Sequence, residues 1–207
     1  KTVPLIDPLY VNTKHTAFPG DSPAEEYKTM QLDWPIPHED RKPGGPSSSR
    51  ITIRISLLPE DFRKTQGSGN SKHAVERHIP ENEGISIVRN GREVFYDHVP
   101  HWPGKPFAEI DRWWGCEVSF DAVLDKEFTV KNIKRGAVPV RELKKALADK
   151  INPTRETALE KVREVWARAR AADLVTATQT GTATGHEVAE RAAKNTPTPK
   201  GLLDATK

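Results

Sequence analysis

Alternating hydrophobic and polar residues mark strands in the middle of the chain. In residues 51–57 every odd-numbered side chain is Ile or Leu, and in residues 112–120 every even-numbered side chain from Trp114 onward is apolar. Successive side chains of a strand point to opposite faces, so each segment presents one apolar and one more polar face. Both segments are therefore predicted to be strands with one face in a core.

A hairpin is predicted around the dipeptide Asn90-Gly91. Residues 85–88 and 93–96 flank it, and both segments carry β-branched or aromatic side chains. Asn-Gly readily supplies positive φ at both central positions of a type I′ turn, the turn that best matches the twist of two paired strands. We expect the strand at 112–120 to pair with this hairpin in one antiparallel sheet.

Beyond residue 138 the hydrophobic period changes from two to between three and four, which indicates helices. One helix is predicted over residues 139–150, with Pro139 tolerated in its first turn. A second is predicted over residues 154–173, because Asn152-Pro153 breaks the first helix and can cap the next. An antiparallel sheet backed by helices makes the predicted fold class α+β.

Charged residues of the second helix are spaced for ion pairs. Glu160 and Glu164 lie three and four residues before Arg163 and Arg168, respectively. Side chains at this spacing are neighbours on a helix surface, so we expect two ion pairs within the helix.

Proline, glycine and low-complexity sequence suggest how the chain is divided. The 17 prolines concentrate before residue 60 and near residue 100, and they break the amino-terminal third into short extended pieces. The predicted divisions are an extended proline-rich lead-in at 1–49, an α+β core domain at 50–152, a C-terminal helix at 153–174, and a low-complexity linker or tail at 175–207 with a short charged helix at 186–194.

Composition narrows the class of protein. The 32 Lys and Arg residues nearly balance the 29 Asp and Glu residues, so the chain as a whole is not a polycation built for nucleic acid. A single cysteine, Cys116, excludes an intramolecular disulfide and a cysteine-rich zinc site. No apolar run approaches the roughly 18 residues of a membrane span and no signal-peptide core is present, so we expect a cytoplasmic protein without membrane association.

Two segments carry a resemblance to a known superfamily. Residues 84–92 read G-I-S-I-V-R-N-G-R, and residues 112–128 form an aromatic strand that leads into F-x-x-x-L-D-x-x-F. Together they resemble the transducer region of GHKL ATPases, the superfamily of gyrase, heat-shock chaperones of the ninety-kilodalton class, histidine kinases and MutL, and in particular its large bacterial members. The resemblance implies the transducer fold, which is shared with a small-subunit ribosomal-protein domain and agrees with the α+β prediction.

The same resemblance singles out three cationic residues. In these relatives a loop of the type V-T-x-N-K-Q follows the aromatic strand, and its Lys contacts the terminal phosphate of ATP held on the preceding domain. That Lys corresponds to Lys134, and Lys131 and Arg135 flank it as further binding residues. An ammonium group on a loop can distinguish ATP from ADP because only ATP has the contacted phosphate. The alternative is that Lys134 is a solvated surface lysine.

The nucleotide pocket of such an ATPase is missing from the sequence. The family places an acidic residue and an asparagine on one helix and an Asp-x-Gly-x-Gly turn under adenine, and neither occurs here. We therefore expect a fragment that neither binds ATP nor catalyses a reaction alone. The resemblance implies ATP and Mg in the parent protein, an upstream ATP-binding domain of the same polypeptide as the partner, and a homodimeric parent.

A local excess of positive charge supports an alternative function. Residues 131–170 carry 12 Lys and Arg against five Asp and Glu. Clustered cations can neutralise phosphates, so this stretch could make the chain a nucleic-acid-binding module. A solvated helix face laced with Glu is the simpler alternative, and a self-contained enzyme with an unrecognised site is a third.

Two further groups of residues are assigned structural roles. Gly67–Asn70 (G-S-G-N) lacks the Gly-Lys-Ser/Thr of a phosphate loop and is predicted to be a flexible turn. Asp121 is predicted to cap a short helix that contains Asp125, in preference to a pair of catalytic carboxylates, because its side-chain oxygen can satisfy free backbone amides.

The remaining candidates are histidines, tryptophans and the cysteine. The spacing of the histidines does not suit a metal site on a helix, so no metal is predicted for His73 with His78 or for His98 with His101. Trp113 and Trp114 face opposite ways on a strand, so one is expected in the core and the other against a neighbour, in preference to a base-stacking platform. Cys116 is expected to be a small buried hydrophobe.

Overall fold

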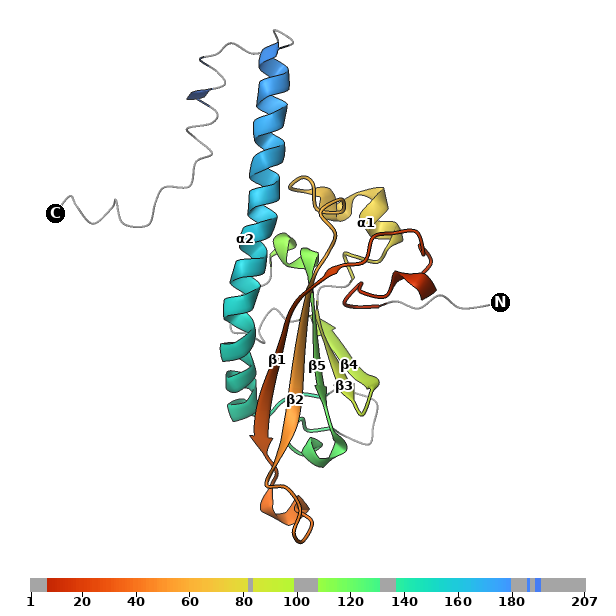
Figure 1. The fold of residues 1–207 in the computed structure, drawn as a ribbon, viewed down its shortest axis with the longest axis vertical. Coiled ribbons are helices and arrows are strands. Elements are labelled where there is room, and N and C mark those ends of the chain that lie inside the picture. The colour runs from red at the N-terminus through yellow and green to blue at the C-terminus, as the bar shows by residue number, and fades with distance from the viewer. Residues whose placement is uncertain are drawn as a thin grey trace, which may run out of the picture.

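The computed structural model describes residues 7–81, 84–98, 108–130, 137–179, 186 and 189–190. It confirms the α+β class, with a five-stranded sheet and a long carboxyl-terminal helix that packs along one side of it (Figure 1). The strands are β1 (Glu25–Pro35), β2 (Ser48–Leu57), β3 (Gly84–Arg89), β4 (Arg92–His98) and β5 (Trp114–Phe120), and the α-helices are α1 (Lys72–Glu76) and α2 (Arg141–Gln179). Short 3-10 turns complete the list: η1 (Thr13–His15), η2 (His38–Asp40), η3 (Ser68–Asn70), η4 (Glu109–Trp113) and η5 (Ala122–Leu124).

The sheet is mixed, with the strand order β1-β2-β5-β3-β4. β5 is antiparallel to β2 and parallel to β3, with Ile85 opposite Cys116. The expectation that β5 pairs with the hairpin in an antiparallel manner was therefore wrong. β5 pairs with β3, the first strand of the hairpin, and not with β4. β4 runs antiparallel to β3, whereas β5 runs in the same direction as β3.

The local strand and hairpin predictions are confirmed. In β2 the side chains of the odd-numbered residues from Ile51 to Leu57 are all buried. Asn90 and Gly91 have φ values of 49° and 76°, the positive values that a type I′ turn requires. β3 and β4 pair across this turn with one register shift, at Ile87/Val88.

β1 lies within the proline-rich lead-in and was not anticipated as a strand. It pairs with β2 with one register shift, between Glu26 and Lys28, and Met30, Leu32 and Trp34 pack against the core from it. Only these three apolar residues alternate, among Glu, Lys, Asp and Gln, so the segment has too weak a pattern to be recognised alone. Pairing with the strongly apolar β2 supplies the ordering that the local sequence lacks.

α2 is a single helix of 39 residues, so the expected break at Asn152-Pro153 was wrong. Proline inside a helix removes one backbone hydrogen bond and costs about 3 kcal/mol. Pro153 lies on the exposed side of α2, where water can satisfy the carbonyl that it leaves unpaired. On the opposite side Ile151 and Ala158 are fully buried, and this packing on both sides of Pro153 offsets the lost hydrogen bond.

A buried ion pair fixes α2 to the sheet. The guanidinium of Arg155 donates from Nε and Nη2 to the two carboxylate oxygens of Asp111, over 2.6 and 2.7 Å, and the two side chains are 7% and 1% exposed. Asp111 also accepts from the indole N–H of Trp114 and from the backbone N–H of Ala108, each at 2.9 Å. Four donors therefore compensate the desolvation of one carboxylate.

Replacing Asp111 with asparagine should destabilise the fold strongly. Asp111→Asn keeps the shape of the side chain but removes the carboxylate charge that faces the buried Arg155 guanidinium, so we expect the free energy of unfolding to fall by about 3 kcal/mol or more. Urea unfolding followed by circular dichroism measures the loss. The matched control is Asp33→Asn, because Asp33 meets Arg50 at 3.5 Å with both side chains more than half exposed. This control should cost less than about 1 kcal/mol. Equal losses of unfolding free energy in the two variants would show that the buried ion pair contributes no more to stability than the exposed one.

Candidate functional site

The three cations singled out from the sequence, Lys131, Lys134 and Arg135, lie outside the described residues. The two ends of their loop are described, and a side chain joins them. The hydroxyl of Thr129 donates to the backbone carbonyl of Val138 over 2.6 Å. Ala137 is buried at 2% exposure. The base of the loop is therefore closed and attached to the core.

A second set of contacts connects the loop base to β1 and to α2. The backbone N–H of Val140 donates to the carbonyl of Glu127 over 2.8 Å, immediately before α2 begins. The carboxylate of Glu127 accepts from the indole N–H of Trp34 in β1, also at 2.8 Å. Glu127, near the end of the aromatic segment, thus contacts both the residue before α2 and the strand β1. A backbone hydrogen bond thus joins the residue before α2 to the loop base.

The acidic turn before this loop differs in detail from the prediction. Asp121 occupies the N-cap position of η5, but its side chain makes no capping hydrogen bond. The capping oxygen comes from Asn90, whose Oδ1 accepts from the backbone N–H of Ala122 at 3.0 Å, so the capping role assigned to Asp121 was wrong. Asp125 forms a bidentate ion pair with Arg89 at 2.6 and 2.7 Å. This pair ties the turn to β3.

The tryptophans and the cysteine are built into the core. Trp113 is fully buried and Trp114 is 8% exposed with its indole N–H bonded to Asp111, so neither ring offers a face for a nucleic-acid base. Cys116 is buried, as expected, and burial raises the pKa of its thiol above the ordinary value. A thiol held neutral in this way is a packing group and not a nucleophile.

The described side chains of His73 and His78 have separate surroundings. His73 packs its ring edge-on against Phe62, with 4.6 Å between ring centroids, and His78 sits at a backbone φ of 55°. The side chain of His98, and His101 as a whole, lie outside the described residues. Within the described ranges no group of three His, Cys, Asp or Glu residues is placed to hold a metal ion.

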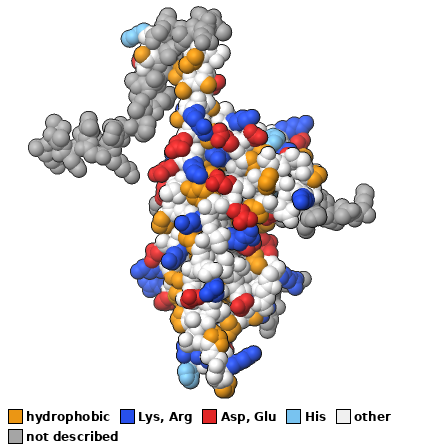
Figure 2. Space-filling model, in the orientation of Figure 1, with side chains coloured by type: hydrophobic (Ala, Val, Ile, Leu, Met, Phe, Trp, Pro, Cys, Tyr) orange, Lys and Arg blue, Asp and Glu red, His pale blue; other side chains and the backbone are white. Residues whose placement is uncertain are grey.

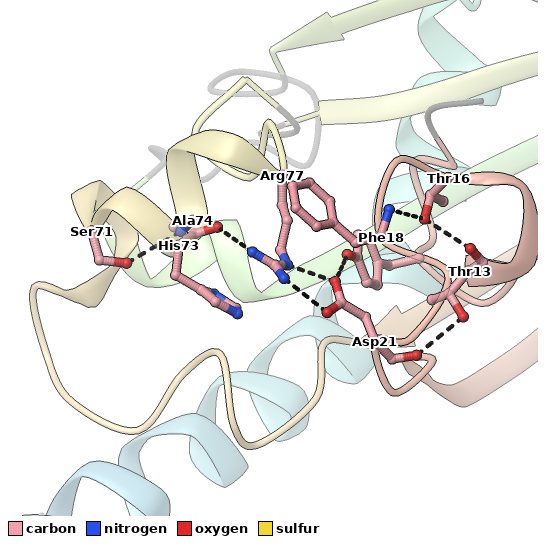
Figure 3. A network of polar contacts seen from close by, with 9 residues as sticks. Thr13, Thr16, Phe18, Asp21, Ser71, His73, Ala74 and Arg77 are labelled. Carbon is pink, nitrogen blue, oxygen red and sulfur yellow. Dashed lines mark hydrogen bonds and ion pairs between the residues drawn. The ribbon is translucent and has the colours of Figure 1, made fainter. Parts of the chain in front are cut away.

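A polar network that sequence patterns did not reveal joins the amino-terminal segment to α1 (Figure 3). Asp21 accepts two hydrogen bonds from the guanidinium of Arg77, at 2.6 and 2.8 Å, and one from the hydroxyl of Tyr10 at 2.5 Å. The Arg77 guanidinium also lies 4.0 Å from the centre of the Phe18 ring. Asp21 and Arg77 are 56 residues apart, so no local spacing could have signalled the contact.

The network changes the titration of its members in opposite directions. The hydrogen bonds from Arg77 are the main cause that lowers the pKa of Asp21 below its ordinary value. Burial, followed by the hydrogen bond to Asp21, raises the pKa of Tyr10 above its ordinary value. At neutral pH the carboxylate of Asp21 therefore stays charged and the phenol of Tyr10 stays neutral. We call Tyr10, Asp21 and Arg77 the clamp, because their contacts join the amino-terminal segment to the end of α1.

The clamp should make stability depend on pH in the acid range. Because the folded-state pKa of Asp21 is depressed, its contribution is present above the unfolded pKa of about 3.9 and is lost as pH falls through the lower folded value. Asp21→Asn should therefore flatten the fall in unfolding free energy below about pH 4. Urea unfolding at a series of pH values measures the slope. Arg77→Gln removes the main cause of the lowered Asp21 pKa, so it should also flatten the fall in unfolding free energy at acid pH. An unchanged slope in Arg77→Gln would show that another group controls the titration.

The cations of α2 lie mainly along the two borders of its buried face. Arg155 is paired with Asp111, Lys161 meets Glu25 at 3.4 Å, and Arg168 meets Glu60 at 3.1 Å. The prediction of ion pairs within the helix, Glu160 with Arg163 and Glu164 with Arg168, was wrong. Arg168 turns to Glu60 instead, and among the described residues Arg163 has no ion pair. Five of the six carboxylates of α2 share the outward side of the helix: Glu142, Asp149, Glu156, Glu160 and Glu164.

Charge of both signs is therefore mixed along α2. On the face shown in Figure 2 acidic and basic side chains alternate over the surface, without a broad area of one sign. On this face such mixing is typical of a solvated helix surface.

No family model, no curated protein and no solved structure matches this chain. Among the described helices none combines the length and the apolar character that a bilayer-spanning segment needs.

Proposed function

We propose that this chain is a transducer-like module of a GHKL-type ATPase, which couples the nucleotide state of an ATP-binding domain earlier in the polypeptide to regions that follow it. Lys134 is the residue proposed to contact the terminal phosphate of ATP, with Lys131 and Arg135 beside it. The module would have no catalytic activity alone, and the ATP and Mg would be held by the ATP-binding domain.

The observation that carries this proposal is the closed base of the cationic loop. Thr129 and Val138 join the two ends of the loop, and Val140 continues from it into α2 through its bond to Glu127. A loop with fixed ends can present an ammonium group to a neighbouring phosphate at a defined position, which is what preorganised charge stabilisation requires. Because α2 starts at the same point, contact with the phosphate would bias the position of the helix.

The form of α2 suits transmission over a distance. At 1.5 Å per residue its 39 residues span about 58 Å. The buried positions of α2 end at Trp166, and the following turns extend past the sheet (Figure 1). The projecting turns would be the part of the helix that regions later in the polypeptide contact.

Replacing Lys134 tests the proposal in the ATPase that contains this chain. If the ammonium group stabilises the developing charge on the terminal phosphate, Lys134→Ala should lower ATP turnover by about 10². The affinity for ADP should hardly change, because ADP lacks the contacted phosphate. Steady-state ATPase assays and ADP titrations measure the two effects.

Lys126→Ala is the matched control for the loss of one positive charge close to the same loop. Lys126 is exposed and pairs with Asp40 at 2.9 Å, so its removal should leave turnover within about twofold, since exposed pairs contribute little. Equal turnover in Lys134→Ala and in the parent would contradict the assigned role. The isolated chain should show no micromolar ATP binding, and calorimetry that detects such binding would contradict the assignment of the nucleotide site to the other domain.

A further inference from the structure

A cleft lies between α2 and η4, away from the loop discussed above. Its volume is about 350 Å³, the lower end of the range for small-molecule sites. The lining residues combine cationic, amide, acidic and apolar side chains: Gln66, Ala108, Glu109, Ile110, Arg163, Trp166 and Arg170. This mixture of a partly apolar wall with a few charged groups is the composition expected of a ligand site.

Two arginines on one side of α2 have guanidinium groups with few hydrogen-bond partners among the described residues. Arg163 and Arg170 are seven residues apart, which is two helical turns, and Trp166 lies between them on the same side. Within the described chain Arg163 has neither a hydrogen bond nor an ion pair. The guanidinium of Arg170 makes one hydrogen bond, to the side-chain amide oxygen of Gln66 at 3.3 Å. Most of the ten N–H donors of the two groups are free to bind an anion.

One acidic side chain among the described lining residues opposes them. The carboxylate of Glu109 and the guanidinium of Arg112 both lie 3.2 Å from the point where a Cβ on Gly69 would be, so the two charged groups are neighbours. Arg112 also donates to the side-chain oxygen of Asn70 at 2.8 Å. With one carboxylate and two guanidinium groups among the described lining residues, the charge of the described lining is net positive.

The walls of the cleft are held in place before any ligand binds. The indole N–H of Trp166 donates to the carbonyl of Arg63 at 3.0 Å, and Trp166 is only 7% exposed. η4, which carries Ile110, is fixed by the ion pair between Asp111 and Arg155. A site whose walls are already ordered loses little conformational entropy when it binds.

We propose that this cleft binds a small phosphate-bearing molecule. The guanidinium groups of Arg163 and Arg170 donate to its phosphate oxygens, and the remainder of the molecule packs on Ile110 and Trp166. Guanidinium groups match phosphate geometry and hydrogen-bond it in a bidentate manner. Two groups that start about 10 Å apart along the helix axis can share a phosphate or diphosphate, which offers several oxygens, better than a carboxylate with two. This inference is independent of the proposed role of Lys134.

Calorimetry on the full chain with inorganic pyrophosphate tests the proposal at constant ionic strength. We expect a dissociation constant below about 1 mM and a loss of at least about tenfold in Arg163→Ala and in Arg170→Ala, since each removes charge-assisted hydrogen bonds. Gln66→Glu keeps the size of the side chain but places a carboxylate on Arg170, so it should abolish binding. Glu109→Gln removes the opposing charge and should tighten binding several-fold.

Matched variants elsewhere separate this site from general electrostatic attraction. Lys150→Ala removes an exposed charge from the same helix outside the cleft, and Gln31→Glu makes the same charge change on β1 as Gln66→Glu makes in the cleft. Both should leave the affinity within about twofold. Losses as large as those of the cleft variants would overturn the proposal, and so would the absence of heat at millimolar pyrophosphate. Acetate binding as tightly as pyrophosphate would overturn the assignment to phosphate.

Discussion

The buried ion pair between Asp111 and Arg155 is the constraint on which the arrangement of the molecule depends. It joins η4, the start of β5 and the middle of α2 through one carboxylate with four hydrogen-bond donors. A buried pair contributes little net stability compared with apolar groups of similar size, but it tolerates only one register of the helix on the sheet. The position of α2, and hence of both the base of the cationic loop and the cleft beside the helix, follows from this register.

Local patterns predicted those parts of the fold whose residues lie close in the sequence. The alternation in β2 and the Asn90-Gly91 turn were recognised because a strand face and a tight turn are determined by the residues within them. The apolar spacing that predicted a helix after residue 138 likewise corresponds to buried side chains, among them Leu143, Leu147 and Ile151. These elements need no information about distant partners.

Contacts between distant residues explain most of what the sequence did not predict. β1 becomes a strand because β2 pairs with it, and α2 continues through Pro153 because residues on both sides are buried against the sheet. The cleft unites Gln66 with Arg170, which are 104 residues apart, and the clamp at Asp21 spans 56. The candidate loop is different, because Lys131, Lys134 and Arg135 were chosen through a resemblance and their roles stay a prediction.

β1 illustrates how a weak strand pattern can benefit the folded protein. As the terminal strand of the sheet it has one edge with no neighbouring strand among the described residues, and such edges invite pairing with the strand of another molecule. Its exposed Glu25, Glu26, Lys28 and Asp33 surround that edge with charge, and Pro35 closes it with a residue that has no backbone N–H. The residues that concealed β1 from recognition as a strand are thus the ones that protect the sheet from edge-to-edge aggregation.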